Sequence, residues 1–147
     1  MYWYSKRKRI ILGIIKIVKL KKLKNINGNI LSFLKKGDSN FKKFGEVYFS
    51  WIHSNKVKAW KLHKKMTINL TVPYGDVKFV FFFKKSNKFR TINIGEKNCK
   101  MISVPPGVWF GFKGISKHSS LIVNLADLPH DKKEILRQKK NDIRFNW

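Results

Sequence analysis

Hydrophobic and polar positions alternate most clearly between Val57 and Val72. A period of two predicts β-strands with one buried face and one face that is either wet or lines a cavity. We expect a turn near Lys64-Lys65 to split the stretch into two strands. The apolar even positions are Trp60, Leu62, Met66, Ile68, Leu70 and Val72, and the polar odd positions are Lys61, His63, Lys65, Thr67, Asn69 and Thr71.

Short strand-like runs separated by turn residues cover most of the remaining chain. Val77 to Phe83 is apolar except for Lys78, which predicts a strand buried on both faces between two layers. Strands at this spacing, separated by Gly and Pro turns, are typical of an all-β sandwich or barrel. Further strands are predicted within 16–24, 30–34, 45–52, 89–94, 100–104, 108–112 and 120–126.

The two ends of the chain depart from the strand pattern. Asp131 to Glu134 has the spacing of a capping box and predicts a short helix over about 132–139. Near the N-terminus, the basic run Ser5–Arg9 precedes an apolar run that is too short for a signal core or a membrane span. We therefore expect a basic and apolar extension over 1–15, with peripheral membrane contact as an alternative. A single domain is expected over 16–147, with no integral membrane segment.

Composition narrows the classes of protein that fit. With 147 residues, of which 43% are apolar and 14% aromatic, the chain can bury a core, which excludes global disorder. Cys99 is the single cysteine, which excludes an intramolecular disulfide framework and a Cys-rich zinc module. A reducing, cytoplasmic location is the natural interpretation.

The net charge of +25 favours an anionic partner, which can be nucleic acid, a membrane surface or a phosphorylated small molecule. The charge is carried mostly by lysine, whereas nucleic-acid readers rely on arginine, and no RNA-binding aromatic signature is present. We therefore expect no nucleic-acid partner. An AT-rich coding bias toward lysine remains open beside attraction of an anionic ligand. No phosphate-binding glycine loop or dinucleotide fingerprint occurs in the sequence.

Five segments in order carry a resemblance to a known family. They are Gly45–Ser50, Val57–His63, Leu70–Lys78, Val104–Phe112 and Asn124–Asp127, followed by the Pro129-His130-Asp131 turn and Glu134. Over Lys16 to Trp147 the chain resembles the short epimerase-like cupins of the dTDP-4-dehydrorhamnose 3,5-epimerase family, also called RmlC-like cupins. The resemblance implies a cupin jelly-roll barrel, usually a homodimer formed by sheet exchange or stacking. It also implies a pocket for a nucleoside-diphosphate sugar, no cofactor, and a role in surface-polysaccharide synthesis.

The activity implied by the resemblance is that of an isomerase. A proton is moved next to the C4 ketone of a nucleoside-diphosphate 4-keto-6-deoxy sugar, and His63 matches the family histidine that removes it. Imidazole suits this step because its pKa lies near working pH, and Lys61 is available for a developing enolate. Keto-isomerisation between C3 and C4, or a non-catalytic cupin that binds the sugar nucleotide, are the alternatives.

Several positions depart from the family pattern. Phe110 stands where the family has a histidine, and Val123 where it has the tyrosine that serves as acid. Tyr48 and Tyr74 are therefore candidate substitute acids, with structural roles as the alternative. No bound metal is expected, because His63 lacks a second histidine two residues on and a later histidine ligand. Candidate substrate-binding residues are Lys61, Lys65, Thr67, Asn69, Trp109, Phe112 and Asn124.

Overall fold

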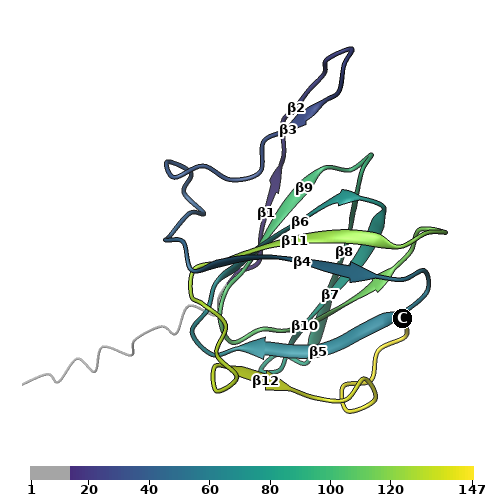
Figure 1. Ribbon diagram of the computed structural model, residues 1–147. Coiled ribbons are helices and arrows are strands. Elements are labelled where there is room, and N and C mark those ends of the chain that lie inside the picture. Colours follow the sequence, from purple (N-terminus) through teal and green to yellow (C-terminus); the bar gives the residue numbers. More distant parts are fainter. Residues whose placement is uncertain (1–13) are drawn as a thin grey trace, which may run out of the picture.

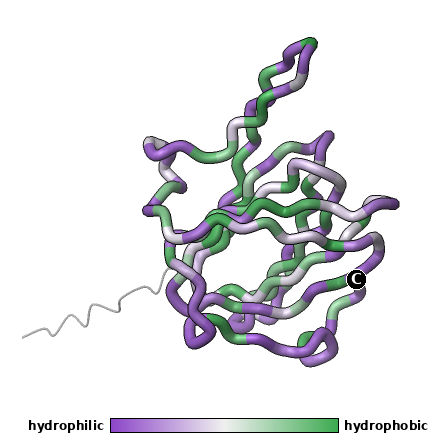
Figure 2. The backbone as a smooth tube through the Cα atoms, viewed as in Figure 1, coloured by the Kyte–Doolittle hydropathy of each residue, from purple (hydrophilic) through white to green (hydrophobic). Residues whose placement is uncertain are grey.

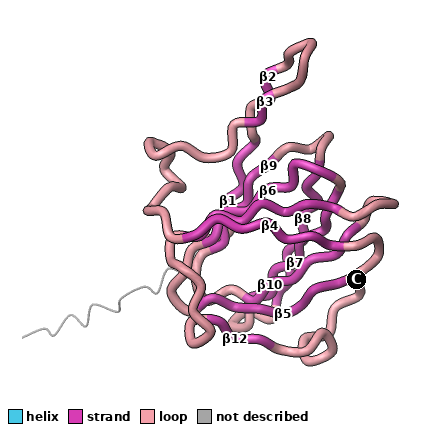
Figure 3. Tube along the Cα trace, viewed as in Figure 1, coloured by secondary structure: helices cyan, strands magenta, loops and turns pink. Residues whose placement is uncertain are grey.

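A computed structural model describes residues 14–147, which are built from strands and contain no helix, hence none that could cross a membrane (Figures 1 and 3). The predicted all-β class is confirmed, while the expectations for Met1–Gly13 lie outside the described residues. The strands are β1 Lys16–Lys19, β2 Lys22–Leu23, β3 Ile30–Leu31, β4 Glu46–Ile52, β5 Val57–His63, β6 Ile68–Tyr74, β7 Asp76–Phe83, β8 Lys88–Gly95, β9 Lys100–Val104, β10 Trp109–Gly114, β11 Ser120–Ala126 and β12 Ile135–Arg137.

Two antiparallel five-stranded sheets form the body of the molecule. Their strand orders are β1-β9-β6-β11-β4 and β12-β5-β10-β7-β8, and the small hairpin β2-β3 projects away from them (Figure 1). The sheets do not close on each other through backbone hydrogen bonds, so β4 is an edge strand of the first sheet and β12 of the second. This unclosed side becomes important for the site.

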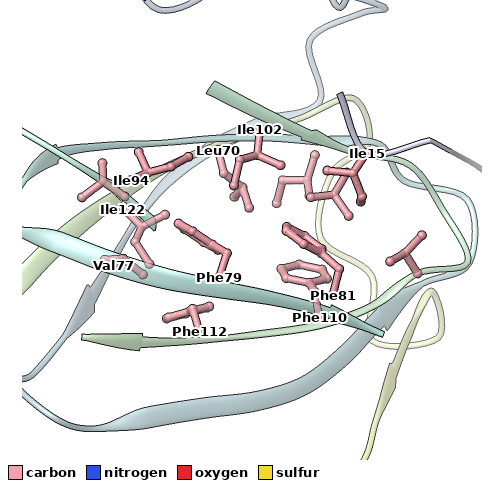
Figure 4. Close-up of a cluster of buried hydrophobic side chains, with 14 of the residues drawn as sticks. Ile15, Leu70, Val77, Phe79, Phe81, Ile94, Ile102, Phe110, Phe112 and Ile122 are labelled. Carbon is pink, nitrogen blue, oxygen red and sulfur yellow. The ribbon is translucent and has the colours of Figure 1, made fainter. Parts of the chain in front are cut away.

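The main core lies between the two sheets. Phe79, Phe81 and Phe110 extend from the second sheet toward aliphatic side chains of the first, among them Leu70 and Ile102 (Figure 4). All five side chains are essentially inaccessible to solvent. The strand predicted to be buried on both faces is confirmed, because Val80 of β7 points into a second cluster on the outer face. Apolar stretches accordingly follow the central strands, and polar residues the loops (Figure 2).

The second cluster is covered by the C-terminal segment. Trp60, Val80 and Trp109 pack there with Ile143, and the Trp147 ring lies 5.1 Å from that of Trp60 between centroids, with the two planes tilted by 43°. The indole N–H of Trp60 also donates to the carbonyl oxygen of Ile143 at 3.2 Å. The chain after β12 therefore seals the outer face of the second sheet.

The predicted helix over 132–139 is wrong. The chain makes one turn at 132–134 and then pairs with β5 as strand β12. The Glu134 carboxylate does not reach back to a cap residue, as a capping box requires, but accepts hydrogen bonds from the backbone N–H groups of Lys65 and Met66. These long-range bonds and the ladder with β5 replace the local helical bonds.

The polar positions between Lys61 and Thr71 do not share one face, contrary to the sequence interpretation. The predicted turn is confirmed, but it carries the chain from β5 in one sheet to β6 in the other. Lys61 lies opposite Phe110 and so shares its inward face, whereas Ile68 and Leu70 take the inward positions of β6. Asn69, between them, therefore points outward. The turn between β5 and β6 exchanges the inward and outward positions. The sequence cannot reveal this exchange, because polar and apolar residues continue to alternate across the turn.

Candidate active site

A cleft of about 480 Å³ opens between β4 and the edge of the second sheet. It lies on the side where the two sheets do not close on each other, because no backbone hydrogen bonds join β4 to β5 or β12. Its volume is within the range of small-molecule sites. The lining includes Tyr48 and Ser50 of β4, Lys58 and Lys61 of β5, Phe112 of β10, and Arg137 of β12.

A β-bulge in β5 arranges the basic side chains of this cleft. Phe110 pairs with Lys61 but Phe112 pairs with Lys58, so the register shifts by one residue between them. Because directly paired residues share a face, Lys58 and Lys61 both lie on the side of the two phenylalanines. His63, two residues beyond Lys61, lies on the same face.

His63 and Glu134 form a buried pair beside the cleft. Their Nδ1 and Oε2 atoms are 2.9 Å apart, and the two residues are 3% and 8% exposed. The second carboxylate oxygen accepts from the backbone N–H groups of Lys65 at 2.6 Å and Met66 at 2.9 Å. Since an ionised carboxylate only accepts, the imidazole proton resides on Nδ1 and the Nε2 lone pair is left free. Within residues 14–147, Nε2 is buried and has no hydrogen-bond partner.

The protonation states of the pair suit a base. Burial lowers the pKa of His63, and the charges of Lys61 and Arg137 lower it further against the raising effect of Glu134. Burial alone would raise the pKa of Glu134, but the backbone N–H groups of Lys65 and Met66 and the bond to His63 outweigh it, and the pKa falls below its usual value. At neutral pH the pair is therefore a neutral imidazole held by a carboxylate.

The turn that precedes β10 fixes the end of β5 next to this pair. Gly107 has φ +84°, a left-handed conformation that glycine adopts without steric cost. Its N–H donates to the carbonyl oxygen of His63 at 2.8 Å. The turn at Pro105-Pro106-Gly107 thus positions the backbone of the candidate base.

Three cations border the cleft. The Lys61 Nζ lies 5.0 Å from the centre of the Phe110 ring, and Arg137 is its cross-strand neighbour on β12. Burial, followed by the charges of Arg137 and Lys58, lowers the pKa of Lys61 to about 8. In the described part of the chain, His63–Glu134 is the one pair within ion-pair distance, so these cations have no carboxylate partner. The cleft is therefore suited to an anion.

Tyr48 stands on the opposite wall, on β4. Burial, and then the charge of Glu46, raises the pKa of the phenol to about 12, so it keeps its proton at neutral pH. Asn124 lies behind this wall with 2% exposure, and its amide donates to the Tyr48 carbonyl oxygen at 3.2 Å and to Ser50 Oγ at 3.1 Å. Asn124 thus supports the wall from inside the fold.

The remaining candidates lie away from the cleft. Tyr74 is exposed and stacks on His118, with 4.7 Å between ring centroids. Lys65 is exposed in the turn after β5, and Trp109 packs in the outer cluster. Thr67 and Asn69 are buried on the outer side of the first sheet, where the Asn69 amide donates to the Asn40 carbonyl oxygen at 3.4 Å. The structure therefore gathers His63, Tyr48, Lys61 and Phe112 and leaves these five apart.

Sequence reasoning missed Glu134, Arg137 and Lys58 as site residues. The capping-box spacing places Glu134 at a helix cap, although the rarity of carboxylates, 8 against 33 basic residues, is a signal that each can have a specific partner. Nothing in the local pattern distinguishes Arg137 or Lys58 from the other basic residues. Their positions follow from the pairing of β12 with β5 and from the bulge.

Comparison with known proteins decides the family. No family model matches the chain. A solved dTDP sugar isomerase from Desulfovibrio desulfuricans G20 is 30% identical, covers 90% of each chain and superposes with a TM-score of 0.87. The chain belongs to the RmlC-like family of sugar-nucleotide epimerases and isomerases. The resemblance drawn from the sequence motifs is thereby confirmed.

Two further proteins are similar to this RmlC-like chain. A dTDP-4-dehydrorhamnose 3,5-epimerase from Sulfolobus tokodaii shares the fold, with a TM-score of 0.79 at 19% identity over 92% of this chain and 82% of that one. A probable low-salt glycan biosynthesis epimerase from Haloferax volcanii is 30% identical over 83 residues, 52% of this chain. That match spans about half of the curated relative, 53% of its length.

Proposed function

We propose that this RmlC-like protein is a sugar-nucleotide isomerase of the 3,5-epimerase type. Its substrate would be a nucleoside-diphosphate 4-keto-6-deoxy sugar, on which a proton is moved at a carbon next to the C4 ketone. The observation that carries the proposal is the buried His63–Glu134 pair beside a cationic cleft. Relatives named as epimerases and isomerases of such sugars support the same chemistry.

The two walls of the cleft carry out different steps of the proposed reaction. On the β5 side, Nε2 of neutral His63 takes the proton, and Glu134 stabilises the imidazolium that forms. The C–H electron pair becomes a carbon–carbon double bond, and the carbonyl π pair moves onto the oxygen to give an enolate. On the β4 side, the Tyr48 hydroxyl returns a proton from the opposite face. Val123, at the family tyrosine position, has no proton to give.

Keto-isomerisation between C3 and C4 is the second candidate, and Val123 is the observation that favours it. Such a shift takes a proton from C3, passes the C3 hydroxyl proton to the C4 oxygen and adds a proton at C4, so one base on one face of the sugar suffices for the carbon-bound proton. It needs no acid on the opposite wall. The two reactions leave different labels in deuterated water, because epimerisation places deuterium at C3 or C5 and keto-isomerisation places it at C4.

Solvent exchange tests the proposed function directly. The protein is incubated in deuterated water with a panel of thymidine-diphosphate 4-keto sugars, and the ring protons are followed by NMR. We expect label incorporation that His63→Ala abolishes and that the matched control His118→Ala retains, because His118 is exposed and outside the cleft. Saturable binding with no exchange by the unaltered protein would instead identify a non-catalytic sugar-nucleotide-binding cupin.

A homodimer is proposed through the outer face of β4. Val47, Phe49 and Trp51 alternate outward there and are 45%, 64% and 51% exposed on an edge strand. A second copy fits this strip, because an apolar edge strand is normally covered. Light scattering is expected to give twice the chain mass, and Trp51→Asp to give the monomer; a monomeric unaltered protein would contradict the dimer. A cytoplasmic location and a role in surface-polysaccharide synthesis are proposed on the family resemblance.

A further inference from the structure

A second polar cavity lies on the outer side of the first sheet, where the loop between β3 and β4 crosses the strands. Its volume is about 200 Å³. None of its residues lines the cleft at His63 or belongs to the exposed strip on β4. Its polar lining consists of two lysines, three hydroxyl side chains and one amide, with no carboxylate: Lys16, Lys42, Ser39, Thr67, Ser103 and Asn40.

The register of the sheet brings the strand residues of this cavity together. Lys16 of β1 pairs with Ser103 of β9, and Ser103 pairs with Asn69 of β6. Directly paired residues share a face, with their Cβ atoms about 4.5 to 5.5 Å apart. Ile68 points into the core, so its neighbours Thr67 and Asn69 point outward. The sheet therefore presents an ammonium group and two hydroxyl groups to the same space.

The loop between β3 and β4 is fixed over this row by its own hydrogen bonds. The Asn69 amide donates to the Asn40 carbonyl oxygen at 3.4 Å. The Asp38 carboxylate accepts from the Lys35 N–H at 2.8 Å, and the Asp38 carbonyl oxygen accepts from the Phe41 N–H at 2.9 Å. The one carboxylate of the loop is thus engaged in its own turn and does not neutralise the lysines of the cavity.

Two buried polar atoms in the cavity lining have no partner. Thr67 and Asn40 are 5% and 9% exposed, and within residues 14–147 neither Thr67 Oγ1 nor Asn40 Oδ1 has a hydrogen-bond partner. Buried polar atoms are normally paired, so unpaired ones indicate a ligand. In the same part of the chain neither Lys16 nor Lys42 forms an ion pair. A matching ligand accepts from the ammonium and hydroxyl groups and also donates to the amide oxygen.

We propose that this cavity is a binding site for inorganic phosphate. Three phosphate oxygens accept from Lys16, Lys42 and the hydroxyl groups of Thr67 and Ser103, and the remaining P–OH group donates to Asn40 Oδ1. The cavity volume of about 200 Å³ is large enough for this ion but not for a nucleoside attached to it. Because the cavity is separate from the cleft, the site is independent of the sugar-nucleotide chemistry proposed for His63.

The donor requirement distinguishes inorganic phosphate from similar anions. At neutral pH inorganic phosphate keeps at least one P–OH group, whereas sulfate has lost both protons. A phosphate monoester has a second pKa of about 6, so it is mostly a dianion without a proton to donate. We expect sulfate and thymidine monophosphate to bind at this site roughly tenfold more weakly than inorganic phosphate, or less.

An amide NMR titration of the full chain with inorganic phosphate tests the site. At about pH 7.5 and about 0.15 M salt, which screens attraction by exposed lysines, the Thr67 and Ser103 signals are expected to shift saturably. Thr67→Val keeps the shape of the side chain and removes the hydroxyl, so it should weaken binding roughly tenfold or more. Thr71→Val is the matched control, because that buried hydroxyl lies outside the cavity and already donates to the Lys100 carbonyl oxygen at 2.9 Å.

The titration has clear results against the proposal. Shifts confined to Lys61 and Arg137 would place phosphate in the cleft and overturn the second site, as would unchanged affinity in Thr67→Val. Sulfate or thymidine monophosphate bound as tightly as inorganic phosphate would refute the assignment of the ligand. If Thr67→Val does not fold, Lys16→Met provides the same test on an exposed side chain, with Lys88→Met on β8 as its control. Unchanged affinity in Lys16→Met likewise refutes the site.

Discussion

Replacing Glu134 with glutamine tests most directly whether the buried carboxylate sets the tautomer of His63. The carboxylate accepts three hydrogen bonds, two from the backbone N–H groups of Lys65 and Met66 and one from His63 Nδ1. Glutamine has one acceptor oxygen. If that oxygen keeps the two backbone bonds, the amide NH2 faces Nδ1 and can only donate. The imidazole must then carry its proton on Nε2, which leaves no lone pair toward the substrate.

The expected loss of rate is large, although the change in shape is small. A base locked in the wrong tautomer typically loses roughly a factor of 10⁴ in kcat. Three charge-assisted bonds become neutral ones, each weaker by about 1 kcal/mol, so unfolding at pH 7 should cost about 2 to 3 kcal/mol less. The burial of both partners, 3% and 8% exposed, means that solvent does not compensate.

Three measurements check the Glu134→Gln prediction. Nitrogen-15 NMR of the imidazole distinguishes the tautomers, the solvent-exchange assay gives the rate, and urea unfolding gives the stability. Glu96→Gln, an exposed carboxylate outside the cleft, is a matched control. A variant that keeps the proton on Nδ1, or that exchanges label within tenfold of the unaltered protein, would refute the reasoning.

Three further predictions follow from the same contacts. Tyr48→Phe should retain label exchange at the carbon next to the ketone but slow epimerised product roughly 100-fold or more, as seen by NMR of the sugar, because only reprotonation from the β4 wall is lost. The free energy of unfolding should fall with acid, because folding lowers the pKa values of both His63 and Glu134. Full stability requires a pH above about 6.5, the pKa of histidine in an unfolded chain, and urea midpoints should decrease below that pH. Phe79→Ala should cost about 3 to 5 kcal/mol in urea unfolding, whereas Ile26→Ser, at the exposed tip of the β2-β3 hairpin, should change it by less than about 0.5.

The strand content of the fold is predictable from local pattern, since period-two alternation reflects one buried face per strand. What the pattern does not contain is the sheet to which each strand belongs. Lys61 and Asn69 occupy equivalent places in the alternation, yet Lys61 faces the space between the two sheets and Asn69 faces the outer side of its sheet. The turn between β5 and β6 shifts the alternation of inward and outward side chains by one residue. Packing of Met66 and Ile68 into the core stabilises this shifted arrangement.

The site was only partly predictable for a related reason. His63 was identified through its motif, but its partner is 71 residues away in the chain. Asp131 does cap the turn that the capping-box spacing predicts, because its Oδ1 accepts a hydrogen bond from the Lys133 N–H at 2.9 Å. The helix is lost because Glu134 gains more from two backbone donors and an imidazole inside the fold than from one at a helix terminus.

The arrangement of the core explains why the chemistry is confined to one edge. Phe79, Phe81 and Phe110 fill the space between the sheets, so a polar ligand cannot enter the centre without displacing well-packed rings. Between β4 and β12 no backbone hydrogen bonds join the two sheets, and the packing of the phenylalanine rings ends at this side. Polar groups placed there are partly desolvated by the core yet can be reached by a ligand. Desolvation lowers the pKa values of Lys61 and His63, so Lys61 is a stronger acid than a free lysine and His63 is a neutral base. Closing the two edges through hydrogen bonds would stabilise the barrel and at the same time remove the cleft.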